Sequence, residues 1–207
     1  MTKPTIYLAA GGTGGHLFPA IALARALQKK NFKTIILTDA RAMQYASQTE
    51  GVDLQLLTSG SIYSGGKIKK FLAPLKILLG VLKAMIIMIS NRPVAVIGFG
   101  GYPSFPPLLA ARLLFCKIAI HEQNAVLGRA NRMLSLLGAR IAASYAGTRH
   151  VPSSSRGSMV VTGNPVRPEV LRYKDSAYSR PNENGTFNLL VFGGSQGASI
   201  FSTLLPE

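Results

Sequence analysis

Acidic residues are scarce in this 207-residue chain. It has 8 Asp and Glu against 23 Lys and Arg, which gives a formal net charge of +15 at pH 7. So large a positive excess favours an anionic partner: a nucleic acid, a phosphorylated ligand or the surface of an anionic membrane. Apolar residues make up 47% of the chain. That share is too high for a disordered chain and is sufficient for a buried core.

Cysteine is almost absent as well, since Cys116 is the only one. A single cysteine excludes an internal disulfide, and its place in an apolar run is typical of a buried, unreactive thiol. The sequence has no Asp-x-Asp motif and no Cys or His pair with the spacing of metal ligands. We therefore expect neither a metal site nor another cofactor.

No apolar run resembles an ordinary transmembrane helix. The most hydrophobic stretch, residues 71–90, contains Pro74, Lys76 and Lys83, whereas a spanning helix needs about 20 mostly uncharged residues. The first residues lead directly into an apolar strand, without the apolar core and cleavage site of a signal peptide. We expect the stretch 71–90 to pack in the protein or to lie on a membrane surface.

Strand and helix patterns alternate along the chain, which predicts a doubly wound, Rossmann-like α/β fold with a parallel sheet covered on both faces. We predict such a domain over residues 1–164, a polar linker over 165–185 and the start of a second such domain over 186–207. The predicted strands are 5–10, 33–38, 53–58, 94–98, 117–121, 140–144, 159–162 and 187–192. The predicted helices are 16–31, 68–90, 107–115 and 129–137.

The first strand is followed by a glycine-rich loop, Gly-Gly-Thr-Gly-Gly-His at residues 11–16. Glycines let the backbone approach a ligand closely, and the start of the following helix offers free N–H groups to phosphate oxygens. A dinucleotide fingerprint would need glycine where Leu17 stands. Asp39, after the second strand, could still imitate the ribose-binding acid of a nicotinamide-dependent oxidoreductase, so that class stays open.

His16 ends this loop and is a candidate general base. A neutral imidazole there could accept a proton from an attacking hydroxyl. The helix N-terminus disfavours the cationic form, which keeps the base form available at neutral pH. A purely structural role for this histidine stays open.

Three further strands are followed by glycine-rich or polar segments. Residues 98–104 read Gly-Phe-Gly-Gly-Tyr-Pro-Ser and form either a second phosphate site or a glycine-rich turn. Residues 121–124 read His-Glu-Gln-Asn, which suits hydrogen bonding to a sugar, and Glu122 is an alternative base. Arg167, in Gly-Asn-Pro-Val-Arg at 163–167, could hold a phosphate or lie solvated on the surface. Ligands of such folds bind at the carboxyl edge of the sheet, where these segments fall.

The basic residues gather in one predicted helix. No Asp or Glu occurs between Asp53 and Glu122, whereas Lys69, Lys76 and Lys83 recur every seven residues and share one stripe. The rest of its surface is mostly apolar, which is typical of an interfacial helix attracted to anionic lipids. A domain-packing helix with one solvated face stays open. Nucleic acid is disfavoured, since no aromatic residues are interleaved with the basic ones.

Taken together, five segments resemble the MurG family of glycosyltransferases. They are Gly-Gly-Thr-Gly-Gly-His at 11–16, Gly-Gly-Tyr at 100–102, His-Glu-Gln-Asn at 121–124, Gly-Asn-Pro-Val-Arg at 163–167 and Gly-Gly-Ser-Gln-Gly-Ala at 193–198. They occur in the family's order and cover nearly the whole chain. The resemblance implies the N-terminal, acceptor-binding half of a two-domain GT-B transferase.

The family's activity is a step of peptidoglycan synthesis. Such enzymes move N-acetylglucosamine from UDP-N-acetylglucosamine to the C4 hydroxyl of a muramoyl-pentapeptide carried on undecaprenyl diphosphate. The resemblance implies that configuration inverts and that no metal is required. It also implies a peripheral place on the cytoplasmic face of the bacterial inner membrane, with the basic helix as the membrane contact.

Matching positions carry the family's roles to this chain. His16 is the favoured base, with Glu122 as the alternative. The acceptor diphosphate is expected between the first loop and the loop Gly100, Gly101 and Tyr102. The expected donor contacts are Thr13, Gly14, Gly15, Asn124, Arg167 and Ser195.

A complete family member has a whole second domain beyond residue 207. We therefore expect this chain to be a truncated or partial sequence that transfers little or no sugar alone. The alternative function is a non-catalytic module that holds a lipid diphosphate at the membrane. The strand at 187–192 should be poorly ordered, since it has no partner strands.

Overall fold

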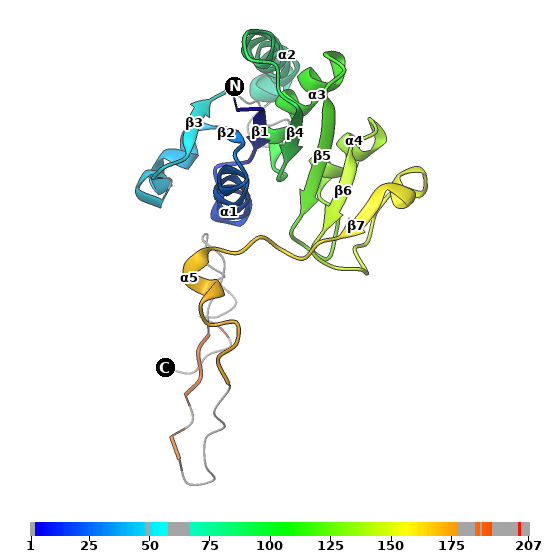
Figure 1. The fold of residues 1–207 in the computed structure, drawn as a ribbon. Helices are drawn as coiled ribbons and strands as arrows, with labels where there is room; N and C mark the ends of the chain where they lie inside the picture. The colour runs from blue at the N-terminus through cyan, green and yellow to red at the C-terminus, as the bar shows by residue number, and fades with distance from the viewer. Residues whose placement is uncertain are drawn as a thin grey trace.

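The computed structural model of the protein describes residues 3–48, 50–57, 67–177, 185–186, 188–191 and 203. Its centre is a seven-stranded sheet in the order β3-β2-β1-β4-β5-β6-β7, with every neighbouring pair parallel (Figure 1). The strands are β1 (Thr5–Ala9), β2 (Lys33–Thr38), β3 (Asp53–Leu56), β4 (Ala95–Gly98), β5 (Lys117–Glu122), β6 (Arg140–Ala143) and β7 (Met159–Val161).

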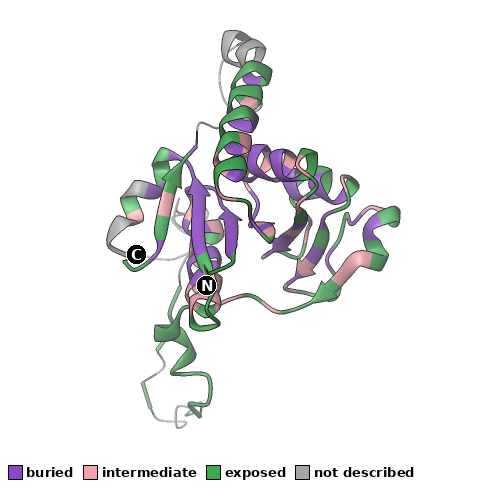
Figure 2. Cartoon of the chain, turned by 45° about the horizontal axis from the view of Figure 1, so that its top comes forward, coloured by how far each residue is buried: buried purple, intermediate pink, exposed green. Residues whose placement is uncertain are grey.

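Helices cover both faces of this sheet. One face packs against α1 (Gly14–Lys29), and the other against α2 (Lys67–Ser90), α3 (Phe105–Leu113) and α4 (Arg129–Leu136). Strand β1 is buried from end to end: Ile6 and Leu8 face α1, whereas Tyr7 and Ala9 face the α2–α3 layer. This two-sided burial explains the continuous apolar strands of the sequence, and the strands lie at the buried centre of the molecule in Figure 2.

The strand order reverses between β1 and β4. The chain leaves β1 through α1 on one face and returns to β4 through α2 on the other. In open α/β sheets, ligands bind outside the carboxyl ends of the strands at such a switch point. The two glycine loops, which follow β1 and β4, lie on its two sides.

The predicted α/β class and the strands up to residue 162 are confirmed, with ends shifted by up to two residues. Helix α3 begins two residues earlier than predicted because Pro106 and Pro107 fit its first turn, where a missing N–H costs nothing. The 3-10 helices Ala40–Gln48, Tyr102–Ser104 and Ser153–Ser158 were not predicted, and neither was α5 (Pro168–Leu171) inside the linker. The domain boundaries stay predictions.

The predicted strand at 187–192 is wrong for residues 188–191, which have no regular secondary structure. Leu189 and Leu190 are 70% and 80% exposed. Within the described ranges no strand pairs with them, and an isolated strand has no hydrogen-bond ladder to hold it. Residues 187 and 192 and the glycine loop 193–198 lie outside the described residues.

Candidate functional site at the carboxyl edge of the sheet

The glycine loops after β1 and β4 touch through their backbones. The N–H of Gly11 donates to the carbonyl of Gly100 at 3.3 Å. Gly100 and Gly101 have φ angles of +87° and +74°, which side-chain-bearing residues rarely adopt. A Cβ on Gly101 would also lie 3.3 Å from the Cα of Gly11. The close approach of the two loops therefore requires glycine on the β4 side.

His16 lies directly over this backbone contact. A Cβ added to Gly100 would be 3.2 Å from His16 Cε1, and one added to Gly101 would be 3.3 Å from His16 Cδ2. Its Nδ1 lies 3.3 Å from Oε1 of Gln123, which follows β5. Three neighbouring strands thus position one half-buried imidazole at the switch point.

A hollow of about 330 Å³ opens beside His16. It brings together the predicted acceptor loop, both candidate bases and one predicted donor contact. Its lining residues are His16, Gly100, Gly101, Tyr102, Glu122, Asn124 and the stretch 128–131.

Glu122 is held inside the protein. Its side chain is buried, at 2% exposure. One carboxylate oxygen accepts from the N and Nδ2 of Asn124, and the other from the N of Gly128 and the Nδ2 of Asn131, at 2.8–3.0 Å. Proton transfer to this carboxylate would weaken all four bonds. The geometry therefore favours His16 over Glu122 as the base.

The His-Glu-Gln-Asn segment is more internal than a sugar-binding role predicts, because His121 and Glu122 are both buried. His121 Nε2 lies 3.0 Å from the carbonyl of Gly163. Burial lowers the pKa of His121; the hydrogen bond to Gly163 and the charge of Glu122 oppose this effect but are smaller. Only Asn124 of the four is exposed, and it is the member best placed for an external ligand.

A second hollow, of about 360 Å³, lies beyond the start of α1. Gly14, Gly15 and Arg167 line it together, and the guanidinium of Arg167 lies 4.6 Å from the centre of the Phe18 ring. Of the other predicted donor contacts, Asn124 lies in the first hollow and Thr13 lines neither. Ser195 lies outside the described residues.

The N-terminus of α1 has no side-chain cap, although Thr13 holds the capping position. The N–H of His16 donates to the carbonyl of Thr13 at 3.1 Å, and this first turn lies at the same end as the glycine loops. Such a terminus favours an anion through its N–H groups and its dipole.

The carboxylate of Asp39 binds Arg41, two residues further along the chain. One carboxylate oxygen accepts from Nε of Arg41 at 2.9 Å, and the other from the backbone N of Arg41 at 3.1 Å. A Cβ on Gly12 would lie 2.7 Å from the backbone N of Ala42 in the same turn. Gly12 is thus required by packing, and the carboxylate is occupied, which counts against the oxidoreductase alternative.

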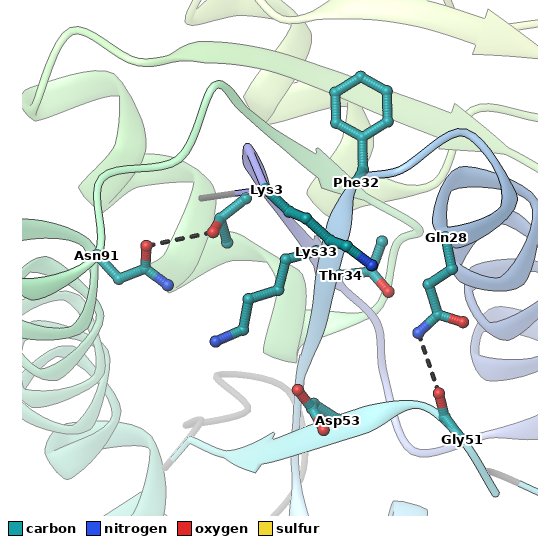
Figure 3. A pocket seen from close by; sticks show the side chains of 9 residues that line it. Lys3, Gln28, Phe32, Lys33, Thr34, Gly51, Asp53 and Asn91 are labelled. Atoms are coloured by element: carbon teal, nitrogen blue, oxygen red, sulfur yellow. Dashed lines mark hydrogen bonds between the residues drawn. The ribbon is translucent and has the colours of Figure 1, made fainter. Parts of the chain in front are cut away.

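A cavity of about 660 Å³ lies at the opposite edge of the sheet, where the strands begin (Figure 3). Lys3, Lys33 and Asp53 line it, next to the hydrogen-bonded pair Thr5 and Asn91. None of the predicted site residues reaches it. The described residues that were predicted to form the site lie instead toward the carboxyl edge.

Helix α2 has two apolar faces. Ala73, Val81, Ala84 and Met88 are buried against the core. The opposite face exposes Leu75, Leu78, Leu79, Leu82, Ile86 and Ile89, each 47–66% exposed. Among the described residues, its segment Ala73–Ser90 is the one helix long and apolar enough to cross a membrane. Its packing on α3 and the sheet is typical of a helix that lies on the protein surface.

Lys76 and Lys83 are exposed beside this apolar face, and Lys83 Nζ also donates to the carbonyl of Leu56 at 3.1 Å. Lys69 belongs to the first turn of α2, and its side chain lies outside the described part. Phe115, at the end of α3, is 85% exposed with a φ of +57°. Arg92, after α2, donates to the neighbouring carbonyl of Leu114, so the two helix ends lie together.

Comparison with known proteins agrees with this architecture. Residues 6–143 match the model of the glycosyltransferase family 28 N-terminal domain. The chain is 43% identical over 207 residues to a protein of Rhodospirillum centenum and 45% identical over 204 residues to one of Paramagnetospirillum magneticum. Both relatives are named UDP-N-acetylglucosamine–N-acetylmuramyl-(pentapeptide) pyrophosphoryl-undecaprenol N-acetylglucosamine transferase.

These alignments cover 100% and 99% of this chain but 54% and 55% of the relatives. The chain thus spans about half the length of the curated relatives it matches. The crystal structure of Acinetobacter baumannii MurG is similar with a TM-score of 0.66 at 32% identity, over 86% of this chain and 50% of that one. The resemblance to the MurG family and the GT-B fold class are thereby confirmed. The chain belongs to glycosyltransferase family 28, whose N-terminal domain it contains.

Proposed function

We propose that this chain is the acceptor-binding half of an inverting N-acetylglucosamine transferase. The donor is UDP-N-acetylglucosamine, and the acceptor is the C4 hydroxyl of a muramoyl-pentapeptide on undecaprenyl diphosphate. The observation that carries the proposal is the half-buried His16 over the contact of two glycine loops, beside a hollow at the switch point. The choice of substrates rests on the names of the two relatives.

His16 is the proposed general base. It removes the proton of the acceptor hydroxyl while the oxygen attacks C1 of the donor sugar from the face opposite UDP. The C1–O bond to UDP breaks, UDP leaves with the bonding electron pair, and the configuration at C1 inverts. Glu122 is proposed to hold Asn124 and the start of α4 in place, since its carboxylate already accepts four hydrogen bonds.

The two glycine loops are proposed to receive the acceptor diphosphate. Backbone N–H groups at close range and a helix N-terminus can stabilise phosphate charge. Gly100, Gly101 and Tyr102 line the hollow beside His16, which supports a diphosphate position close to the proposed base. The hollow between Gly14, Gly15 and Arg167 is the proposed side of the donor, because a guanidinium can bind phosphate through two hydrogen bonds.

The exposed face of α2 is proposed to rest on the anionic surface of the cytoplasmic side of the inner membrane. Its leucines and isoleucines supply apolar contact, and Lys76 and Lys83 beside them supply charge. Phe115 adds an exposed aromatic ring in a backbone conformation that costs about 1–2 kcal/mol for residues with a Cβ. Such surface attachment would keep the hollow near a lipid-linked acceptor.

The test of transfer is made on two proteins: the 207-residue chain, and the chain joined to the C-terminal domain of the Rhodospirillum centenum relative. Label from UDP-N-acetylglucosamine is followed into the lipid-linked acceptor. We expect transfer by the joined protein, little by the chain alone, and loss of transfer in the joined His16→Gln variant. If the folded joined protein is inactive while the chain binds the lipid diphosphate, a non-catalytic lipid-binding module is the better description.

Membrane attachment is tested with vesicles of phosphatidylglycerol and of phosphatidylcholine. We expect the double variant Lys76→Glu and Lys83→Glu to lose binding to the anionic vesicles. Lys30→Glu, an exposed lysine at the end of α1 on the other face of the sheet, is the control for overall charge. Equal binding by the double variant and the parent chain would refute the role of α2.

A further inference from the structure

Gln123 joins the carboxyl ends of three strands through one side chain. Its Nε2 lies 3.1 Å from the carbonyl of Phe99, 3.3 Å from the carbonyl of His121 and 3.2 Å from His121 Nδ1. Its Oε1 faces Nδ1 of His16 at 3.3 Å. Neither the glycine motif nor the residue pattern indicated this role, because Phe99 lies 24 residues away along the chain.

The orientation of this amide follows from its neighbours. The carbonyl oxygens of Phe99 and His121 can only accept, so the NH2 group of Gln123 must face them. The opposite orientation would put the amide oxygen against two carbonyl oxygens. The side of the amide that faces His16 is therefore an oxygen, which can only accept a hydrogen bond.

His121 is oriented by the same reasoning. Its Nε2 contacts the carbonyl of Gly163, so Nε2 must carry the proton. Burial lowers the pKa of His121 and favours its neutral form. In the neutral ring Nδ1 is then an acceptor for Gln123 Nε2, which agrees with the amide orientation.

We infer that Gln123 holds His16 in the tautomer that carries its proton on Nδ1, which leaves Nε2 as the proton acceptor at the hollow. The amide oxygen accepts from Nδ1–H, so a neutral ring has its lone pair on Nε2. Within the described part of the chain, the His16 ring makes its hydrogen bond through Nδ1, which leaves Nε2 for a substrate hydroxyl.

Gln123 is thus a positioning residue, and its importance for catalysis rests on the proposed function. A histidine base in the wrong tautomer presents N–H where the reaction needs a lone pair. The partner of the second ring nitrogen commonly fixes which nitrogen is protonated. Without Gln123 the two tautomers of His16 would mix, and its ring would lose its lateral hydrogen bond.

The tautomer is measured by NMR of the 207-residue chain labelled with 15N in the imidazole rings, at a pH where the rings are neutral. A protonated and a bare ring nitrogen differ strongly in 15N shift. The variants His16→Gln and His150→Gln assign the signals. We expect Nδ1–H for His16 and Nε2–H for His121 in the parent chain. An Nε2–H signal for His16 would overturn the inference, and this needs no variant of Gln123.

The consequence is measured with Gln123→Met, which keeps the length of the side chain and removes both hydrogen-bonding groups. In the chain we expect the His16 signal to move toward a mixture of tautomers, and an unchanged signal would overturn the inference. In the joined transferase we expect kcat to fall about 10- to 100-fold with KM changed little. Unchanged kcat despite a changed tautomer would uphold the assignment of the proton and refute His16 as the base.

Discussion

Replacing Glu122 by Gln keeps the size of the side chain and removes its charge. The parent carboxylate accepts four hydrogen bonds, two at each oxygen. The amide of Gln has one oxygen, and its nitrogen is a donor that must face donors at the other position. We expect the amide nitrogen to turn toward Asn124, which is exposed and can bond to water instead.

The expected loss of stability follows from the two hydrogen bonds that remain at the other oxygen. Gly128 and the buried Asn131, 2% exposed, keep an acceptor, but a neutral one. A hydrogen bond to a charged group contributes about 1.5–3 kcal/mol and a neutral one about 0.5–1.5 kcal/mol, so each bond loses about 1 kcal/mol. We therefore expect Glu122→Gln to lower the free energy of unfolding by about 2 kcal/mol.

The assay is urea unfolding of the 207-residue chain, followed by circular dichroism at neutral pH. Glu169→Gln is the matched control, since Glu169 is exposed in the short helix α5. Surface changes of this kind stay within about 0.5 kcal/mol. Because small domains are stable by only about 5–15 kcal/mol, a loss of 2 kcal/mol moves the urea midpoint clearly.

One result would refute the reasoning. If Glu122→Gln unfolds like the parent chain while the joined transferase loses its activity, the carboxylate is a chemical group and not an anchor. Glu122 would then replace His16 as the better candidate for the base. A loss of stability with retained transfer would instead support the anchoring role.

Four further substitutions test the local structure. Gly12→Ala should lower the free energy of unfolding by about 2–3 kcal/mol, since its Cβ meets the backbone of Ala42. Gly15→Ala has open space around its Cβ and should raise the free energy of unfolding by about 0.5–1 kcal/mol. Equal urea midpoints for the two variants would contradict this. Burial lowers the pKa of His121, so the stability of its neutral form is present above the unfolded pKa of about 6.5 and is lost as pH falls through the lower folded pKa. The free energy of unfolding should therefore decrease less between neutral and mildly acidic pH in His121→Gln than in the parent chain. A parallel decrease in both proteins would refute this expectation. Phe115→Gly should stabilise the chain by about 1 kcal/mol by relieving its positive φ, and a lower thermal midpoint would disprove that.

The fold was largely predictable because its signals are local. Apolar strands, helical periodicity and glycine loops alternate within short stretches, and this alternation leaves few topologies besides the doubly wound sheet. The helix over Ala40–Gln48 was missed because it is a short 3-10 segment with a kink at Tyr45, and so few turns do not establish a helical period. The strand at 187–192 was predicted from local composition, whereas strands depend on distant partners.

The placement of several candidate residues at one edge of the sheet was predictable, but their contacts were not. The carboxyl-edge rule brings His16, Gly100 and Asn124 into one hollow, as expected. The carboxylate of Glu122 accepts hydrogen bonds from Gly128 and Asn131 at the start of α4. The amide of Gln123 donates to the carbonyl of Phe99. Such roles follow from contacts between segments, so no pattern within one segment contains them.

Bare main chain forms the floor under His16, because Gly11, Gly100 and Gly101 meet there without any side chain. A flexible lysine or arginine loses rotamer freedom of up to about 2 kcal/mol when a ligand fixes it. A glycine floor has no such freedom to lose, because the sheet has already fixed its shape during folding. An anion that bound to these loops would therefore order little of the protein, because their backbone already became ordered when the chain folded.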